Sequence, residues 1–502
     1  MKQEEFDMPD YMKLQNGSDI RGVAIATEGG KPVNLTKECV HAIGGAFAKW
    51  LKEKLGESAS RVAIGRDSRL SGAELGLWLQ EGLCAAGLDV TDFGLCTTPA
   101  MFMCTVMEEY RYDGAVMITA SHQPFERNGF KFFTAKGGLE KKDISAVLTA
   151  AGEGSFETGL CGKRDSFDFL PAYAAMLTEK IRAAAGEEKP LSGLRIMVDA
   201  GNGAGGFFAE KVLAPLGADT TGSQFLEPDG RFPNHAPNPE NAAAMEAIRS
   251  AVIANKADLG IIFDTDVDRA GAVLRDGSEL NRNKLIAILA AILLREHPGT
   301  TIVTDSITST GLAAFIAEKG GIHHRFKRGY RNVINEAVRL TALGQDAQMA
   351  IETSGHGALQ ENYYLDDGAY LMVKLLIELA RVRKEGGSLE SLIETLQEPK
   401  ESAEFRMPLL AEDFAAYGNK VIAALQEYAK AQEGWQLADP NFEGVRVQIG
   451  EGWFLLRLSL HDPLMPLNIE SDAEGGIKPI AAALYDFLKD FPGLDASGLQ
   501  NA

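Results

Sequence analysis

Short apolar segments that end abruptly in polar loops recur along this chain, with helical spacing between them. In one unit residues 116–118 lead into a loop that carries Ser121, and in a second residues 259–263 end at Asp264. A third copy of the pattern begins at Thr301. Strands that alternate with helices form sheets covered on both faces, and ligands of such sheets gather at the carboxyl ends of the strands. The pattern therefore predicts three similar α/β domains with mixed or parallel sheets.

The C-terminal part of the chain has a different pattern. Helical spacing over residues 414–431 is followed by two apolar stretches, 445–449 and 453–458, joined by a Gly-Glu-Gly turn that is typical of an antiparallel hairpin. A closing helix over 477–488 completes a predicted small α+β domain. A chain of 502 residues is too long for one core. The expected domain boundaries are 1–160, 161–298, 299–400 and 401–502.

The acidic composition limits the possible partners. The formal net charge is -20, so the surface repels nucleic acid and anionic membranes. An anionic ligand would need a local group of cations or a metal. Five cysteines without zinc-type pairing indicate free thiols in a reducing compartment. Met1–Glu5 does not resemble a secretory signal, and the longest apolar run is too short to span a bilayer. We expect a cytoplasmic monomer or homodimer.

The loop that carries Ser121 is the first candidate site. Pro124 and Gly129 end the preceding strand and shape a turn, which leaves Ser121 at the tip of a loop on a rigid sheet. His122 and Lys131 add a polar and a cationic group nearby. Such a serine is either a nucleophile or phosphate carrier, or part of a turn that satisfies its own backbone.

Three aspartates form the second candidate. Asp264, Asp266 and Asp268 alternate along the chain before Arg269, so in an extended loop their carboxylates would point the same way. Converging carboxylates repel one another unless a cation lies among them, and hard oxygen ligands suit Mg2+. The simpler interpretation is a solvated acidic loop.

Other polar segments are less specific. Glu352 and Ser354 follow a strand and can hydrogen-bond sugar hydroxyls, although Glu352 could equally cap a helix. Residues 327–331 form a short basic loop that suits an oxyanion. The glycine-rich segment 201–205 fits a tight turn better than a phosphate cradle. His235 fits a structural loop better than a ligand site.

Together these segments resemble the alpha-D-phosphohexomutases. Residues 119–124 (Thr-Ala-Ser-His-Gln-Pro) resemble the phosphoserine loop of that family, and 264–269 resemble its metal loop. Residues 352–356 (Glu-Thr-Ser-Gly-His) are similar to its sugar loop. Residues 65–69 and the Pro-Asn-Pro segment also fit. The matches occur in the family's order through essentially the whole chain.

The resemblance implies four domains around a central cleft and a mutase that interconverts hexose 1-phosphates and 6-phosphates. Ser121 would carry the phosphoryl group, Mg2+ would be the metal, and a hexose 1,6-bisphosphate would be the intermediate and activator. The implied catalytic residues are Ser121, Arg21, Lys131 and His122. The implied metal ligands are Ser121, Asp264, Asp266 and Asp268. The implied phosphosugar ligands are Arg269, Lys327, Arg328, Gly329, Glu352, Ser354 and His356, with Arg457, Ser459 and His461 on the non-reacting phosphate.

Two departures leave alternatives open. Thr265 replaces a glycine of the family's metal loop, and Leu460 replaces a glycine of its phosphate clamp. The altered clamp leaves open a protein that binds phosphosugars without turnover. Thr353 of the sugar loop does not select among mannose, glucose and glucosamine. Residues 263–267 also resemble the Asp-x-Asp nucleophile of haloacid-dehalogenase-like phosphatases.

Overall fold

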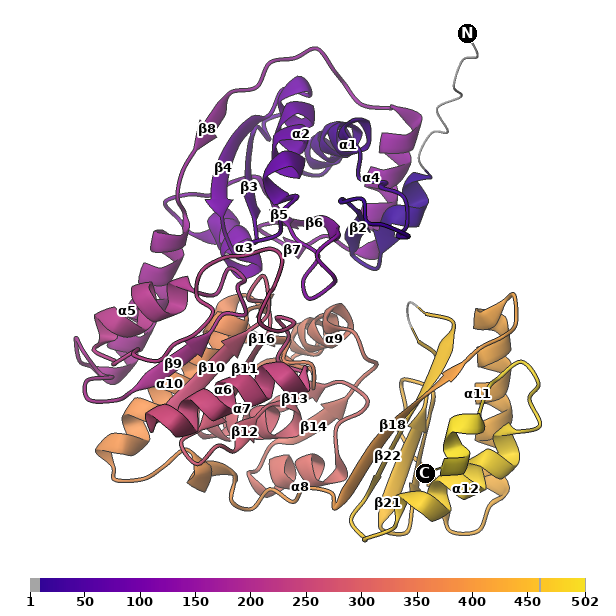
Figure 1. The fold of residues 1–502 in the computed structure, drawn as a ribbon. Coiled ribbons are helices and arrows are strands. Elements are labelled where there is room, and N and C mark those ends of the chain that lie inside the picture. Colours follow the sequence, from indigo (N-terminus) through magenta and orange to yellow (C-terminus); the bar gives the residue numbers. More distant parts are fainter. Residues whose placement is uncertain (1–9, 460–461, 502) are drawn as a thin grey trace. The chain divides into compact units, whose positions relative to one another are not determined.

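A computed structural model describes residues 10–459 and 462–501, and Figure 1 shows its ribbon. The chain divides into two compact units. One contains the residues up to Asn281 together with Ser354–Ser391, and the other contains Arg282–Thr353 together with the residues from Leu392 on. The 3-10 helix η5 (Glu390–Ile393) lies where the chain passes from the first unit to the second.

The first unit begins with an eight-stranded mixed sheet. Strands β5, β3, β4 and β8 are parallel, whereas β6 pairs antiparallel with both β5 and β2. The strand order is β1 (Gln15–Asn16), β2 (Asp19–Val23), β6 (Arg127–Thr134), β5 (Gly114–Ile118), β3 (Arg61–Arg66), β4 (Asp89–Leu95) and β8 (Arg164–Ser166), and β7 (Gly137–Gly138) pairs with β6.

Helices cover both faces of this sheet. On β6, Phe132 packs against Phe47 with ring centroids 4.7 Å apart, and the next residue, Phe133, packs against Phe102 on the other face at 6.3 Å. Successive strand residues point to opposite faces, so the two helices that carry Phe47 and Phe102 lie on opposite sides. The helices are η1 (Tyr11–Leu14), α1 (Lys37–Leu55), α2 (Gly72–Ala85), α3 (Thr98–Val106) and α4 (Lys141–Glu153).

A second sheet in the same unit holds the acidic loop. Its order is β12 (Glu279–Leu280), β11 (Ala270–Leu274), β10 (Leu259–Phe263) and β9 (Ile196–Asp199). Strands β9 and β10 are parallel, but β10 and β11 form an antiparallel hairpin that pairs Phe263 with Ala270. The remaining elements of this unit are α5 (Leu170–Ala185), η2 (Phe208–Leu213), η3 (Ala214–Leu216), α6 (Ala242–Asn255), β16 (Gly357–Leu359), η4 (Gln360–Asn362), β17 (Leu365–Asp366) and α10 (Gly368–Lys384).

The second unit contains a parallel strand trio and a C-terminal antiparallel sheet. In the trio β13 (Thr301–Thr304) lies between β14 (Ile322–Arg325) and β15 (Met349–Ile351). Its helices are α7 (Arg282–Glu296), α8 (Thr310–Glu318) and α9 (Tyr330–Ala342). The C-terminal sheet has the order β18 (Glu401–Pro408), β22 (Leu464–Ser471), β21 (Gly452–Leu456), β20 (Val445–Ile449) and β19 (Trp435–Leu437).

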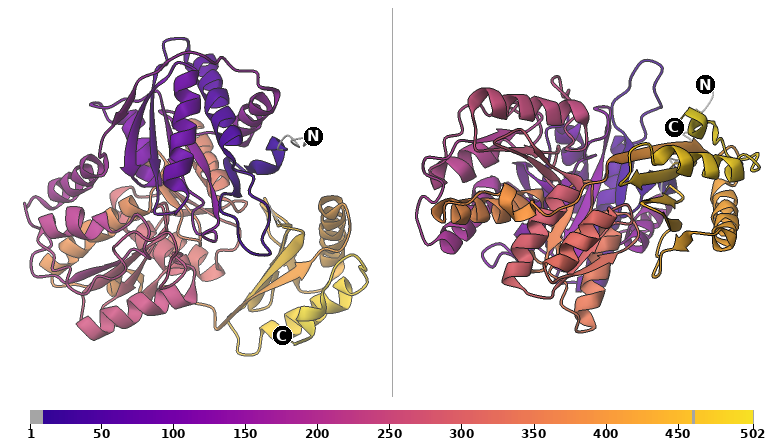
Figure 2. Two further views of the ribbon diagram at one scale, coloured as in Figure 1. Left: turned by 45° about the horizontal axis from the view of Figure 1, so that its top comes forward. Right: turned by 90° about the horizontal axis from the view of Figure 1, so that it is seen from below.

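Two helices, α11 (Phe414–Ala431) and α12 (Ile477–Leu488), pack on one side of the C-terminal sheet, as Figures 1 and 2 show, and η6 (Ser497–Asn501) follows them. Leu425 of α11 and Leu484 of α12 share one buried cluster with Val447 and Phe454 of the strands. The α+β character predicted for this segment is therefore confirmed, as is the α/β character of the preceding ones.

Helix α1 begins at Lys37, because the Thr36 side chain accepts the Cys39 N–H and caps the helix there. The glycine-rich segment 201–205 precedes the short π-helix η2. None of the described helices combines the length and the apolar character that a membrane span needs.

Candidate active site

Ser121 lies in the turn that connects β5 with β6. Its backbone adopts φ +50°, an uncommon conformation for a residue with a side chain. The Thr119 hydroxyl oxygen accepts the Ser121 N–H at 2.8 Å. Gly129, on β6, allows close pairing with β2, because a Cβ there would lie 2.0 Å from the Ile20 carbonyl oxygen. The side chain of Ser121 is buried, so the structure holds its hydroxyl in one place.

The acidic loop forms a turn and not the extended segment that the sequence suggested. Val267 adopts φ +67°, and its N–H bonds the Asp264 carbonyl oxygen at 3.4 Å. The turn follows from the β10–β11 hairpin, which brings the chain back on itself. The carboxylates of Asp264, Asp266 and Asp268 still converge: they offer oxygens that all lie within 4.8 Å of one another, and all three residues are buried.

The Ser121 hydroxyl meets this acidic cluster directly. Ser121 Oγ donates to Asp264 Oδ2 at 3.0 Å and accepts from Arg269 Nη2 at 2.9 Å. Arg269 Nη2 also donates to His122 Nδ1 at 2.6 Å. A guanidinium can only donate, so Nδ1 carries no proton. The charge of Arg269, together with burial, lowers the pKa of His122 to about 2, so His122 is a neutral acceptor beside the serine.

Lys131 and Arg21 supply cations next to the same cluster. Lys131 Nζ lies 2.9 Å from Asp266 Oδ2 and also contacts Asp268 Oδ2. Arg21 donates to the Thr119 carbonyl oxygen at 2.8 Å and to Asp19 at 2.7 Å. Burial opposes the charge on Lys131, but Asp266 and then Asp268 outweigh it and raise the Lys131 pKa well above its usual range. Both side chains are therefore ion-paired cations in this structure.

The pKa values of the aspartates move in opposite directions. Burial, and then the negative charge of Asp268, raises the pKa of Asp264 well above its usual range despite Arg269. Burial would also raise the pKa of Asp268, but the nearby Lys131, His356 and Arg269 hold it below its usual range. The nearby cations therefore favour the charged form of Asp268, whereas burial and the charge of Asp268 disfavour the charged form of Asp264.

The donor set fits a hard divalent cation. The Oδ1 atoms of Asp266 and Asp268 are buried and have no hydrogen-bond partner. A buried carboxylate oxygen without a partner is costly, and a metal ion would satisfy it. Three carboxylate oxygens within 4.8 Å match the oxygen ligands that Mg2+ prefers.

His356 joins the cluster from the segment that follows β15. Its Nδ1 lies 2.6 Å from Asp366 Oδ2 and 3.8 Å from Asp268 Oδ1. Burial lowers the pKa of His356, but Asp366 and then Asp268 outweigh burial and raise it to about 9. Gly355, at φ +93°, brings the chain close to Ala270, whose carbonyl oxygen would lie 2.8 Å from an added Cβ. Ser354, two residues before His356, is buried in the same unit.

The remaining sequence candidates lie in the second unit. Glu352 Oε1 accepts the Gly329 N–H at 2.6 Å, which joins the predicted sugar loop to the predicted basic loop. Arg328 Nε lies 4.0 Å from the Asp305 carboxylate, and the backbone N–H of Arg328 donates to the Glu443 carboxylate at 3.1 Å. Lys327, the other cation of the basic loop, lies with its ammonium 5.5 Å from the centre of the Phe326 ring.

The predicted phosphate clamp is partly described. Arg457 is buried, and its Nε has no hydrogen-bond partner. Ser459 N bonds the Leu464 carbonyl oxygen at 3.0 Å, and its hydroxyl oxygen accepts the Asp462 N–H at 3.2 Å. His461 lies outside the described residues. A buried guanidinium with an unpaired N–H suits an anionic ligand.

The structure adds side chains that the sequence did not single out. Thr98 O–H donates to Asp266 Oδ2 at 2.5 Å, and Asn238 Oδ1 accepts from Arg269 at 3.3 Å. Asp366 orients His356 through its contact with His356 Nδ1. The sequence signal for Thr98 was its place at a helix start after a strand, and the sequence held no signal for Asp366. Gly203 packs on the acidic loop, because a Cβ there would lie 2.7 Å from the Thr265 carbonyl oxygen. The glycine-rich segment is therefore a tight turn.

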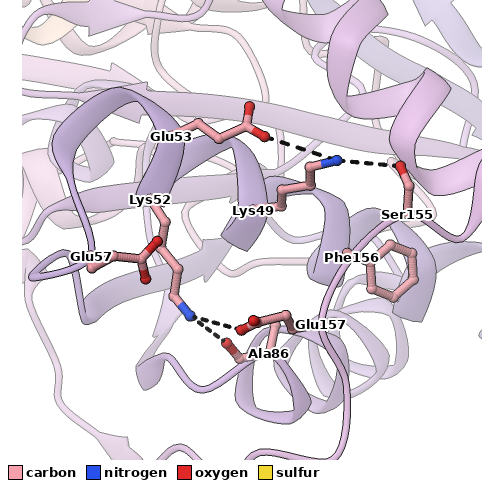
Figure 3. A pocket seen from close by; sticks show the side chains of 8 residues that line it. All are labelled: Lys49, Lys52, Glu53, Glu57, Ala86, Ser155, Phe156 and Glu157. Carbon is pink, nitrogen blue, oxygen red and sulfur yellow. Dashed lines mark hydrogen bonds and ion pairs between the residues drawn. The ribbon is translucent and has the colours of Figure 1, made fainter.

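A separate surface pocket of the first unit does not fit a phosphosugar. Figure 3 shows it beside α1, with Lys49 near Glu53 and Ser155, and with Lys52 near Glu157. Lys49 Nζ lies 3.4 Å from Ser155 Oγ, and Lys52 Nζ lies 3.8 Å from the Glu157 carboxylate. Its lining includes two lysines but three glutamates. A phosphate needs an excess of cations, so this pocket is not a candidate active site.

A buried serine hydroxyl that faces converging carboxylates and paired cations is an arrangement that can support phosphoryl transfer. Comparison with known proteins gives the class of the enzyme, which is that of the phosphoglucomutases and phosphomannomutases. The family descriptions "Phosphoglucomutase/phosphomannomutase, alpha/beta/alpha" domains I, II and III match residues 12–157, 171–277 and 281–399.

Relatives match nearly the whole chain. The phosphomannomutase/phosphoglucomutase of Pseudomonas aeruginosa strain PAO1 is 31% identical over 472 residues, which cover 94% of each chain. The phosphoglucomutase of Neisseria gonorrhoeae is 32% identical over 464 residues, 92% of this chain and 94% of that protein. The crystal structure of a phosphoglucomutase/phosphomannomutase family protein from Burkholderia thailandensis is 30% identical, with a TM-score of 0.79 over 95% of this chain and 97% of that one.

This chain belongs to the phosphoglucomutase/phosphomannomutase family. The predicted family, fold class and enzyme class, an isomerase of the phosphohexomutase type, are thereby confirmed. The family matches span both the Ser121 loop and the Asp264 loop, which supports the phosphohexomutase prediction over the haloacid-dehalogenase alternative.

Proposed function

We propose that this protein moves a phosphoryl group between the 1- and 6-positions of a hexose phosphate, with Ser121 as the phosphoryl carrier. The observation that carries the proposal is the Ser121 hydroxyl, 3.0 Å from Asp264 and 2.9 Å from Arg269 inside a buried carboxylate cluster. A seryl phosphate at this position brings a charge of roughly -1.5 to -2, which the surrounding cations would offset.

The reaction consists of two transfers. Phosphoserine 121 gives its phosphoryl group to the free hydroxyl of a hexose monophosphate: the bond from Ser121 Oγ to phosphorus breaks, and a bond from the sugar oxygen forms. The resulting hexose 1,6-bisphosphate turns over, and its other phosphoryl group returns to Ser121. In the first transfer the proton of the sugar hydroxyl passes to Ser121 Oγ as the phosphoryl group leaves, and in the second the Ser121 Oγ proton passes to the sugar oxygen that gives up its phosphoryl group. A hexose 1,6-bisphosphate would therefore also activate unphosphorylated enzyme.

Arg21, Lys131 and His122 assist this transfer in the proposal. Arg21 and Lys131 are ion-paired cations, so we assign them to stabilising negative charge on the reacting oxygens. His122 accepts a hydrogen bond from Arg269 and so orients the guanidinium that contacts Ser121. Bound Mg2+ would supply charge neutralisation between the phosphoryl group and the carboxylates of Asp264, Asp266 and Asp268.

The sugar and its non-reacting phosphate would bind the remaining candidates. We propose that Glu352 and Ser354 hydrogen-bond the sugar hydroxyls, with His356 beside them. Arg457 and Ser459 would bind the phosphate, supported by the unpaired Nε of buried Arg457. The further proposed phosphosugar ligands are Arg269, Lys327, Arg328 and Gly329, with His461 on the phosphate.

The domain boundaries 1–160, 161–298, 299–400 and 401–502 remain our proposal for the four functional segments. We also propose a reducing compartment such as the cytoplasm, because all five cysteines are free, including Cys161, which is exposed.

A coupled assay tests the function. Glucose 1-phosphate, mannose 1-phosphate and glucosamine 1-phosphate are each supplied with Mg2+ and catalytic hexose 1,6-bisphosphate, and formation of the 6-phosphate is followed. We expect turnover of at least one sugar by the wild-type protein and none by Ser121→Ala. Binding of the phosphosugars by calorimetry without any interconversion would show a non-catalytic relative instead. Preference for the glucosamine derivative would make the protein a phosphoglucosamine-type mutase.

A further inference from the structure

The Arg69 side chain holds the backbone of the Ser121 loop. Its Nη1 donates to the carbonyl oxygens of Pro124 at 2.8 Å and Arg127 at 2.9 Å. Its Nη2 donates to the carbonyl oxygens of Ser121 and Gln123, each at 2.5 Å. One guanidinium therefore binds four carbonyl oxygens from both ends of a single loop, and the Arg69 side chain is fully buried.

A second contact chain from the same loop reaches the Ser121 N–H. The Thr119 hydroxyl donates to Asp67 Oδ2 at 2.6 Å and accepts the Ser121 N–H at 2.8 Å. Asp67 Oδ1 accepts the Arg69 N–H at 2.9 Å. The segment after β3 thus fixes the Ser121 carbonyl directly through Arg69 and the Ser121 N–H indirectly through Asp67 and the Thr119 hydroxyl. This explains how Ser121 keeps φ +50°, a conformation that costs free energy unless its surroundings fix it.

The Arg69 guanidinium also contacts the ring of Phe232, a residue of segment 229–241 whose backbone is strained. The Arg69 guanidinium lies 5.4 Å from the centre of the Phe232 ring, within the range of a cation–π contact. Phe232 adopts φ +48°, which is rare for a bulky residue and costs on the order of 1–3 kcal/mol. Gly230 permits this approach, because a Cβ there would lie 2.4 Å from the Ser68 carbonyl oxygen.

The same segment reaches the acidic loop at its other end. Asn238 Oδ1 accepts from Arg269 Nη1 at 3.3 Å, and Arg269 contacts both Asp264 and Ser121. The segment therefore touches the serine loop through Phe232 and the acidic loop through Asn238. All of these residues lie in the first unit.

We propose that Arg69 and Phe232 form a positioning pair that fixes the Ser121 loop against segment 229–241 and so sets the place of the Ser121 hydroxyl opposite Asp264. Arg69 bonds only backbone carbonyl oxygens of the Ser121 loop through its guanidinium, so the pair acts through the position of this loop. The inference rests on the proposed role of Ser121 as phosphoryl carrier. A lysine at position 69 keeps the charge but lacks the planar fork, so it cannot bind carbonyl oxygens at both ends of the loop.

The test uses Arg69→Lys, Phe232→Leu and the double variant. Arg66→Lys is the control for the first, because Arg66 bonds Asp92 and not the serine loop. Phe225→Leu is the control for the second, because Phe225 also has a positive φ, +53°, but packs on His235. For each protein, kcat and KM for the preferred hexose phosphate are measured, together with the rate at which the bisphosphate phosphorylates Ser121.

We expect kcat and the phosphorylation rate to fall about 10- to 100-fold in Arg69→Lys, because misplacement of a reacting group by about 1 Å has an effect of that size. KM should stay within about threefold of wild type, since binding contacts are intact. Phe232→Leu should show the same split more weakly. The two effects should not add in the double variant, because both variants release the same loop. The controls should match wild type in both constants.

Three results would overturn the inference. The first is a wild-type kcat in Arg69→Lys. The second is a loss that appears in KM and not in kcat. The third is strict additivity in the double variant. Thermal unfolding of each variant separates positioning from misfolding, and a variant whose midpoint falls well below its control is judged by the phosphorylation rate of its folded fraction. If the wild-type protein shows neither mutase activity nor phosphoserine, the proposed function fails, and the inference fails with it.

Discussion

Asp264 should be dispensable for stability without a divalent cation and important with one. Burial, and then Asp268, raises the pKa of this carboxyl well above its usual range, so its charged form is unfavourable. In the wild-type structure Asp264 Oδ2 accepts from Ser121 Oγ at 3.0 Å and from Arg269 Nε at 3.1 Å. Asparagine at this position keeps an oxygen that can accept from both. We expect Asp264→Asn to change the unfolding free energy of the metal-free protein by less than about 1 kcal/mol, because reduced repulsion offsets a weaker pair with Arg269.

Mg2+ should reverse that balance. An ion that binds only the folded state raises the unfolding free energy by about 2.7 kcal/mol at a free concentration 100 times its dissociation constant. Wild type, with three converging carboxylates, should gain this amount. The variant loses one of them and should gain less than about 1 kcal/mol at the same concentration.

Thermal unfolding in EDTA and in MgCl2 measures both effects. The control is Asp165→Asn, in the exposed strand β8, where asparagine keeps the oxygen that accepts the Ser166 N–H. In EDTA the three proteins should unfold within about 2 °C of one another, and Mg2+ should raise the midpoint of wild type and control only. Strong destabilisation of Asp264→Asn in EDTA, or an equal Mg2+ shift in all three, would refute the reasoning.

Three further predictions concern other parts of the site. Gly203→Ala should destabilise the first unit by about 1–3 kcal/mol, because its Cβ would lie 2.7 Å from the Thr265 carbonyl oxygen, which is backbone and cannot move aside as a side chain can. Chemical denaturation measures this loss against Gly205→Ala, whose Cβ would meet the Phe263 side chain instead. Burial lowers the pKa of His235, but the hydrogen bond and charge of Asp199 outweigh burial and raise that pKa. The pair of His235 with Asp199 therefore stabilises the folded state fully below the unfolded pKa of about 6.5, and this stabilisation is lost as the pH rises through the folded pKa. In urea titrations the difference in unfolding free energy between wild type and His235→Asn should shrink from mildly acidic to alkaline pH, and a constant difference would contradict this. Arg457→Met should raise KM for the hexose phosphate at least about tenfold with a smaller change in kcat, as expected for a group that binds a phosphate distant from the reacting one; an unchanged KM in steady-state assays would remove Arg457 from the phosphate site.

The sequence was sufficient to predict candidate site residues that lie in loops directly after buried strands. Ser121 and Asp264 each follow an apolar strand, so each is fixed by the sheet to which that strand belongs, and the family's motifs identify their order. The β20–β21 hairpin and helices α11 and α12 were likewise predictable, because their turn residues and spacing are local signals.

The sequence was insufficient where two distant segments decide the geometry. It placed the three aspartates in an extended loop, but the β10–β11 hairpin bends this segment into a turn with Val267 at φ +67°. It could not assign Arg69 to the carbonyl oxygens of the Ser121 loop, because a guanidinium that binds backbone leaves no complementary side chain to recognise. Nor could it show that Phe232 packs on Arg69, since the two lie far apart in the chain.

Phosphorylation of Ser121 is the most direct test of the account. Purified protein is incubated with Mg2+ and a hexose 1,6-bisphosphate, and intact and digested samples are analysed by mass spectrometry beside Ser121→Ala. The account predicts one phosphoryl group on the wild-type protein, located at Ser121, that is lost when unphosphorylated hexose phosphate acceptor is added, and none on the variant. A phosphoryl group on another residue, or mutase turnover by Ser121→Ala near the wild-type rate, would contradict it.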